Sequence, residues 1–202
     1  MANHCDWTLR ALRLGLALGT IASQALAGAV QNQQIEISLG QDAATIPDVK
    51  WSESDGTGVD TGCLQKRVGI TIRLPDGRAY TSPSEITCFT KVHGRIAGLS
   101  LTPLRKLTTF EGAVAQVRDI AKALGVENDA ALSTRIREWE ARQKSEPQTA
   151  YNGGCSLGKG ASLYIEVRQH PSGKGYYLDV QFYSLKFLQL KGIEDGRSKT
   201  GR

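Results

Sequence analysis

The stretch at residues 153–160, GGCSLGKG, has most of the spacing of a phosphate-binding loop. In such a loop a glycine-rich backbone holds the phosphate, a lysine reaches it, and the next Ser or Thr binds magnesium. Lys159 supplies the lysine, but Gly160 stands where the hydroxyl belongs. The loop also needs a strand before it and a helix after it, whereas Pro147 and a surface helix precede this stretch and the alternating residues of a strand follow. The sequence therefore predicts neither a nucleotide site nor any cofactor.

Histidines and carboxylates give little further support for catalysis. His93 and His170 are the histidines beyond the N-terminal segment, and no nucleophile motif such as G-x-S-x-G accompanies either. Their spacing from the cysteines fits no zinc site. Asp76 in a turn, and Glu166 and Asp179 on a strand face, are expected to be ordinary surface groups. We therefore predict no enzyme and no metal, while a small hydrolase with paired carboxylates stays an alternative because their separation is spatial.

Three cysteines, Cys63, Cys88 and Cys155, follow the N-terminal segment, and three thiols allow one disulfide. If residues 75–77 turn a hairpin, its register brings Cys63 close to Cys88. Closing that loop stabilises a fold by about 3.5 kcal/mol on the chain-entropy estimate. The alternative pair is Cys63 with Cys155, because both lie in glycine-containing segments while Cys88 lies in an apolar strand.

Residues 1–27 have the order of a secretory signal peptide. Arg10 and Arg13 precede an apolar run at residues 14–21, and the small residues at 25–27 form an A-x-A cleavage site. The apolar run is shorter than the roughly 20 residues that a transmembrane helix needs. We predict that the signal is cleaved, that the mature chain is periplasmic or secreted, and that it does not insert into the membrane.

The remaining chain suits a single domain over residues 28–191, with a disordered tail at residues 192–202. The whole sequence has a formal net charge of +5 at pH 7, which is too small to indicate nucleic acid or a membrane surface as a partner. The charge is uneven, because residues 41–62 are acidic and residues 64–106 are basic. Such unevenness is either an ordinary solvated surface or a surface suited to a charged partner.

Periodicity predicts an α+β fold: an antiparallel sheet with one amphipathic helix packed on one face and a second surface helix. A capping box at residues 108–111 begins the amphipathic helix. The expected elements are a strand at residues 33–39, a loop at 40–62, a strand at 68–74, a strand from 78 that breaks at 82–84 and resumes from 86 as far as 101, helices at 110–124 and 130–144, and a final hairpin over 163–183.

One face of the final hairpin combines tyrosines with charged groups, a composition enriched in protein interfaces. We interpret this face as a partner interface. The alternative is that the second helix, with Trp139, covers it. The candidate interface residues are Tyr164, Glu166, Arg168, Tyr177, Asp179 and Tyr183.

Three segments together resemble small periplasmic immunity proteins, antitoxins of contact-dependent interbacterial toxin systems. They are GLSLTPL at 98–104, TFEGAV at 109–114 opening a helix that ends at Leu124-Gly125, and GYYL at 175–178 in the closing hairpin. The resemblance implies a non-enzymatic protein that binds a cognate toxin and occludes its active site. It carries over no site residues. The rival hypothesis is an envelope accessory protein that binds polysaccharide or peptidoglycan.

Overall fold

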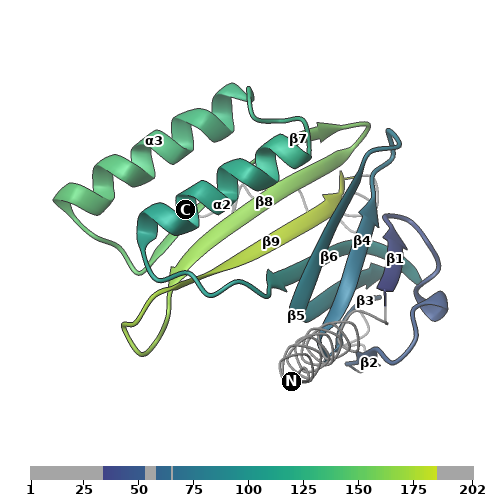
Figure 1. Ribbon diagram of the computed structural model, residues 1–202. Coiled ribbons are helices and arrows are strands. Elements are labelled where there is room, and N and C mark those ends of the chain that lie inside the picture. Colours follow the sequence, from purple (N-terminus) through teal and green to yellow (C-terminus); the bar gives the residue numbers. More distant parts are fainter. Residues whose placement is uncertain (1–33, 53–57, 65, 186–202) are drawn as a thin grey trace, which may run out of the picture. The chain divides into compact units, whose positions relative to one another are not determined.

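The computed structural model describes residues 34–52, 58–64 and 66–185 (Figure 1). The predicted signal peptide and C-terminal tail lie outside these residues. From Ile35 onward the described residues belong to one compact unit. Within them, no helix combines the length and apolar character needed to cross a bilayer.

The fold is α+β, as predicted, with nine strands in one mostly antiparallel sheet and two α-helices among the described residues. The main strand order is β1-β4-β5-β6-β9-β8-β7, and β2 and β3 branch from β5. The elements are β1 (Gln34–Ser38), β2 (Lys50–Trp51), β3 (Val59–Leu64), β4 (Val68–Arg73), β5 (Ala79–Val92), β6 (Arg95–Pro103), α2 (Phe110–Ala123), α3 (Ala130–Ser145), β7 (Ala150–Gly158), β8 (Ala161–Gln169) and β9 (Tyr176–Ser184).

Strand β5 holds the branched sheet together, and the predicted break at residues 82–84 is wrong. Its first half pairs with β4, its second half pairs with β3, and β6 lies along its other edge. Pro83 lies opposite Gly69, and the register against β6 shifts between Ser84 and Ile86. A proline lacks the N–H of a regular ladder, and a bulge beside it accommodates that loss. Ser84 Oγ donates to Ile86 O at 2.7 Å across this irregularity.

The expected continuous strand up to residue 101 is also wrong, because the chain turns at His93 and Gly94. Both residues have positive φ, 50° and 75°. Two successive residues in the left-handed region form the tight turn that matches the twist of a hairpin. Strands β5 and β6 therefore pair antiparallel, with Val92 opposite Arg95. His93 lies exposed in this turn.

The segment at residues 40–62 is not all loop, since β2 and the start of β3 lie within it. Gly62 of β3 allows the side chains of Val49 and Trp51 to pack closely in this polar segment. A Cβ on Gly62 would lie 2.8 Å from Cε3 of Trp51 and 2.7 Å from Cγ1 of Val49. Only glycine therefore lets these two side chains pack against β3. Alternation is weak in this segment, so periodicity did not reveal the strands.

Both helices begin and run where predicted. The Thr109 hydroxyl accepts from Gly112 N at 3.1 Å and caps α2. Because Thr109 is the cap, the third helical residue is Gly112, and Glu111 does not occupy the capping-box position. Asp129 caps helix α3, because its carboxylate accepts from Leu132 N at 2.9 Å.

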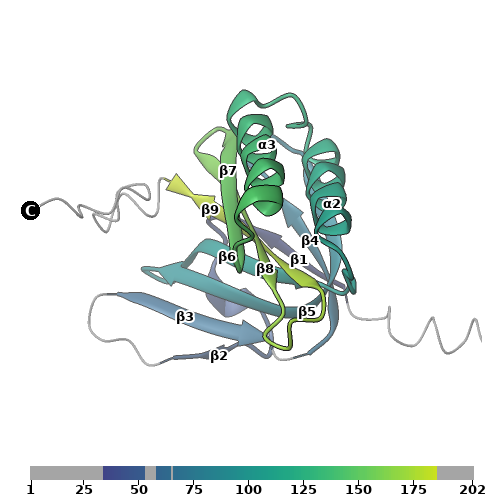
Figure 2. The same cartoon turned by 90° about the vertical axis from the view of Figure 1, so that its left-hand side faces the viewer.

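Figures 1 and 2 show α2 and α3 together beside the strands β7, β8 and β9. The Phe110 ring of α2 lies 4.8 Å from the Tyr151 ring of β7 between centroids. Trp139 of α3 donates from Nε1 to Asn152 O of β7 at 3.0 Å. Arg78 adds a further link, because its guanidinium donates to the main-chain oxygens of Leu124, after α2, and of Leu157, in β7.

The glycine-rich stretch at 153–160, which its composition suggests is a loop leading into the final hairpin, is mostly a strand. Residues up to Gly158 belong to β7, and the tight turn follows at Lys159 and Gly160. A Cβ on Gly153 would lie 2.6 Å from Cγ of Arg135 and 2.9 Å from Cζ2 of Trp139. The glycines therefore allow α3 to approach β7 closely, which a phosphate-binding loop would not require.

Candidate functional site

The register of β8 and β9 places all six predicted interface residues on one face of the sheet. Glu166 lies opposite Asp179, and Arg168 opposite Tyr177, in the antiparallel ladder. The apolar residues that alternate with them point to the other face and are 2 % exposed or less: Leu163, Ile165, Val167, Leu178, Val180 and Phe182. We call the following set the polar face: Tyr164, Glu166 and Arg168 of β8, Tyr177, Asp179, Gln181 and Tyr183 of β9, and Ser100 of β6.

Helix α3 does not cover the polar face. Its Trp139 and Arg135 lie against Gly153 of β7, and Gly153 pairs with Ile165 of β8. Ile165 is fully buried and belongs to the apolar face. The helix therefore lies on the side opposite to Tyr164 and Glu166, which removes the alternative in which Trp139 shields the tyrosines.

A chain of hydrogen bonds orders the part of the polar face nearest β6. Ser100 Oγ donates to one carboxylate oxygen of Asp179, and Gln181 Nε2 donates to the other at 2.6 Å. Tyr183 Oη donates to Gln181 Oε1 at 2.5 Å. The carboxylate of Asp179 thus receives donors on both oxygens, so its orientation is set before any partner arrives.

Glu166 and Arg168 form the second ordered pair of this face. Arg168 Nη2 donates to Glu166 Oε2 at 2.6 Å, and the side chains are 49 % and 11 % exposed, respectively. The hydrogen bond with Glu166, followed by one with Tyr177, raises the pKa of the Arg168 guanidinium. The carboxylate of Glu166 is thus largely buried, and the guanidinium paired with it is half exposed to solvent.

Two tyrosines of this face, Tyr164 and Tyr183, are held as neutral hydrogen-bonding groups. Burial, followed by the charge of Glu166, raises the pKa of Tyr164. Burial, followed by the charge of Asp179, raises the pKa of Tyr183. Both effects disfavour the phenolate, so neither tyrosine is poised as a base or nucleophile. Each combines an apolar ring with a hydroxyl group that can form hydrogen bonds, a combination typical of interface residues.

Gly98 of β6 also contributes to this face, beside an irregularity where the β5–β6 register shifts between Thr90 and Lys91. It lies opposite Tyr183. A Cβ on Gly98 would lie 2.6 Å from Cδ1 and 2.9 Å from Cε1 of Tyr183, so the ring lies directly over the glycine. A glycine inside an alternating strand can signal such close approach as well as a bulge, and here it sets the position of the ring.

The residues considered for other chemistry are not assembled into a site. The Cys63–Cys88 disulfide is present, as predicted, between β3 and β5, and Cys155 has a free thiol. Burial, followed by the charge of Asp129, raises the pKa of Cys155 to about 11, so the thiol is not a ready nucleophile. In the β8–β9 turn, His170 Nδ1 lies 2.7 Å from Ser172 Oγ, and both are exposed. The described residues contain no group of side chains suited to hold a metal ion.

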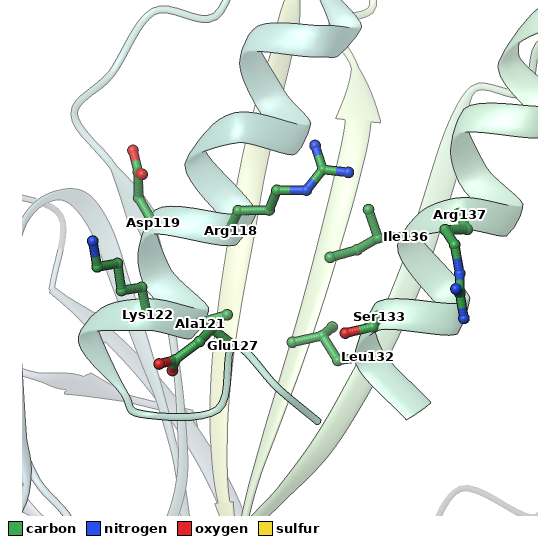
Figure 3. A pocket seen from close by; sticks show the side chains of 9 residues that line it. All are labelled: Arg118, Asp119, Ala121, Lys122, Glu127, Leu132, Ser133, Ile136 and Arg137. Atoms are coloured by element: carbon green, nitrogen blue, oxygen red, sulfur yellow. The ribbon is translucent and has the colours of Figure 1, made fainter. Parts of the chain in front are cut away.

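A groove of about 380 Å³ runs between α2 and α3 (Figure 3). Leu132 and Ile136 of α3 point toward α2, and Arg118 of α2 points back across the gap. Arg118 Nη2 also pairs with Glu140 at 2.8 Å, which joins the helices beside the groove. Its lining is apolar at the base and mixed in charge at the rim, and it lies apart from the polar face.

Comparisons with protein-family models, with curated proteins and with solved structures found no match to this chain.

Proposed function

We propose that this chain is a non-enzymatic periplasmic protein of the immunity type, which binds a cognate toxin and occludes its active site. The observation that carries the proposal is the polar face. Its tyrosines and charged groups are ordered by hydrogen bonds, and neither helix lies over Tyr164 and Glu166. Ordered aromatic and charged groups reduce the entropy that binding must overcome, and they are enriched among the residues that dominate binding energy.

We take α2 to be the amphipathic helix that packs on one face of the sheet, and α3 to be the surface helix. With both on the apolar side, the opposite side is left for a partner. The disulfide supports the compartment, because such bonds persist where the environment is oxidising. The neutral tyrosines and the unreactive Cys155 favour binding over catalysis.

Co-purification tests this function. The tagged mature chain is captured from a periplasmic extract of its native host and compared with the variant Tyr164→Ala/Tyr177→Ala and with Arg137→Ala. Arg137 is exposed on α3 and lines the groove between the helices, so it is a control away from the polar face. Circular dichroism first verifies that all three proteins fold.

We expect a toxin to co-purify with the wild type and with Arg137→Ala, and at least about tenfold less with the tyrosine variant, because two interface anchors are removed. Inhibition of the toxin's activity by the wild type then tests occlusion. Recovery of no protein partner, together with retention of the chain on cell-wall sacculi, would reject the proposal and favour the polysaccharide-binding alternative.

A further inference from the structure

A second hollow adjoins the polar face where β6 and β9 separate. The two strands pair from Gly98–Tyr183 to Leu101–Val180, and in the part of the chain that the structure describes their extensions next pair at the bridge between Leu107 and Tyr176. Between these points residues 102–106 oppose residues 177–179, so the longer segment bows away from the shorter one. A groove of about 590 Å³ occupies this site.

The rim of this groove is basic. Exposed Arg105 and Lys106 come from the segment after β6, and exposed Lys174 comes from the β8–β9 turn. Arg67 and Glu85, which also line it, neutralise each other through an ion pair of 3.0 Å. Glu85 is the one acid in the lining. The groove therefore carries an excess of positive charge at a place where the chain has opened a trough.

Most other cations of residues 64–106, with the exception of Arg95, are paired within the fold, which leaves positive charge at this groove. Lys66 Nζ lies 2.5 Å from Asp48, and Lys91 Nζ lies 3.3 Å from Asp60. Much of the uneven charge in the sequence is thus neutralised by contact between the acidic and basic segments. Among the described residues, Lys106 and Lys174 have no ion-pair partner, and Arg105 reaches Asp119 only at 4.0 Å.

We propose that this groove, termed the basic groove, binds an acidic peptide segment of the protein partner. The inference rests on the proposed function and adds the chemistry of the partner. The bowed segment at residues 102–106 provides the trough, and Arg105, Lys106 and Lys174 provide charge complementarity to an acidic peptide. Tyr177 lines the basic groove and also belongs to the polar face, so the two surfaces are continuous. A neighbouring hollow of about 470 Å³ shares Arg67 and Glu85 and extends to Ile86, which is 48 % exposed. The partner segment is therefore acidic, with an apolar residue placed to meet Ile86.

An NMR titration of the ¹⁵N-labelled mature chain with capped hexaglutamate tests the inference without requiring the partner. Hexaglutamine is the neutral peptide control, and inorganic polyphosphate of equal charge is the polyanion control. The variant Lys106→Glu/Lys174→Glu is compared with Lys122→Glu/Lys144→Glu. All four lysines are exposed, and the second pair lies on the helices, so both variants have the same net charge.

We expect hexaglutamate to shift the amide signals of Lys106, Lys174 and Tyr177, and the groove variant to bind it about tenfold or more weakly, because two attractions become repulsions. The helix variant should bind within about twofold of the wild type, since neither Lys122 nor Lys144 lines the groove. Shifts spread evenly over surface lysines, equal weakening in both variants, or tighter groove binding by polyphosphate would each overturn the inference.

The same variants separate this inference from the proposed function. If a captured toxin depends on Tyr164 and Tyr177 but binds Lys106→Glu/Lys174→Glu as tightly as the wild type, the basic groove is not its docking site and the proposed function stands. If no protein partner is captured while hexaglutamate binds the groove, the proposed function fails and the peptide chemistry stands.

Discussion

The disulfide between Cys63 and Cys88 gives a quantitative prediction for stability. The two residues are direct cross-strand partners of β3 and β5, with a sequence separation of 25. A loop of that length restrains the unfolded chain by about 3.5 kcal/mol on the chain-entropy relation. The other pairs of the β3–β5 ladder remain after reduction, so the native structure should persist while the free energy of unfolding falls by about this amount.

For a chain of this size, the same loss lowers Tm by roughly 7–14 °C. Urea unfolding followed by tryptophan fluorescence, with Trp51 and Trp139 as reporters, compares the oxidised protein, the reduced protein and the variant Cys63→Ala/Cys88→Ala. The variant should be insensitive to reductant, and Cys155→Ala should retain the full difference between oxidised and reduced protein. A loss below about 1 kcal/mol on reduction would refute the argument, because the unfolded state would then be restrained by something other than the disulfide.

Three further perturbations follow from the packing. Gly98→Ala should destabilise the fold by about 1–3 kcal/mol and release the Tyr183 ring, measured by urea unfolding and near-ultraviolet circular dichroism. Folding raises the pKa of Cys155 from 9.0 to about 11. The stability that the protonated thiol contributes should therefore be fully present below pH 9 and decline as the pH rises toward 11. In a series of thermal melts at different pH values, Cys155→Ala should remove that part of the decline. Arg78→Ala should cost about 2–3 kcal/mol in thermal melts, because the main-chain oxygens of Leu124 and Leu157 lose a charged donor.

Each of these has a matched control or a contrary result. Gly112→Ala in α2 meets only the Thr109 hydroxyl, at 3.3 Å, so it should be close to neutral. Equal effects of Gly98→Ala and Gly112→Ala would contradict the role assigned to Gly98. A flat pH profile between 9 and 11 in the wild type would contradict the burial of Cys155, and an Arg78→Ala protein as stable as the wild type would show that its two acceptors find other donors.

The elements that sequence analysis found are those whose side-chain period matches one buried face. Val68, Ile70 and Ile72 alternate and are buried in β4. Phe110 and Val117, at helical spacing, are likewise buried in α2. Alternation in the final hairpin also placed the six candidate residues on one face, because a period of two fixes the face once the pairing register is known.

The errors have a common physical cause: glycine and proline act through backbone geometry that tertiary contacts decide. Pro83 suggested a break, but a bulge absorbs its missing N–H within β5. Gly153 suggested a loop, but it belongs to β7 and makes room for Arg135 and Trp139. His93 adopts a left-handed conformation in the β5–β6 turn. Residues other than glycine rarely adopt this conformation, so the sequence did not indicate a turn there. The basic groove was not predictable, because it arises where the β6–β9 pairing ends.

Site-specific photo-crosslinking tests the central claim, that the polar face binds a toxin, most directly. A benzophenone side chain is introduced at Tyr164, which lies half-buried on the polar face, and in a separate protein at Arg137 on α3. After illumination of living cells of the native host, we predict one specific crosslinked protein from position 164, identified by mass spectrometry as a toxin, and none from position 137. Crosslinks from position 137 with none from position 164 would contradict the account, because the partner would then occupy the helical side of the sheet.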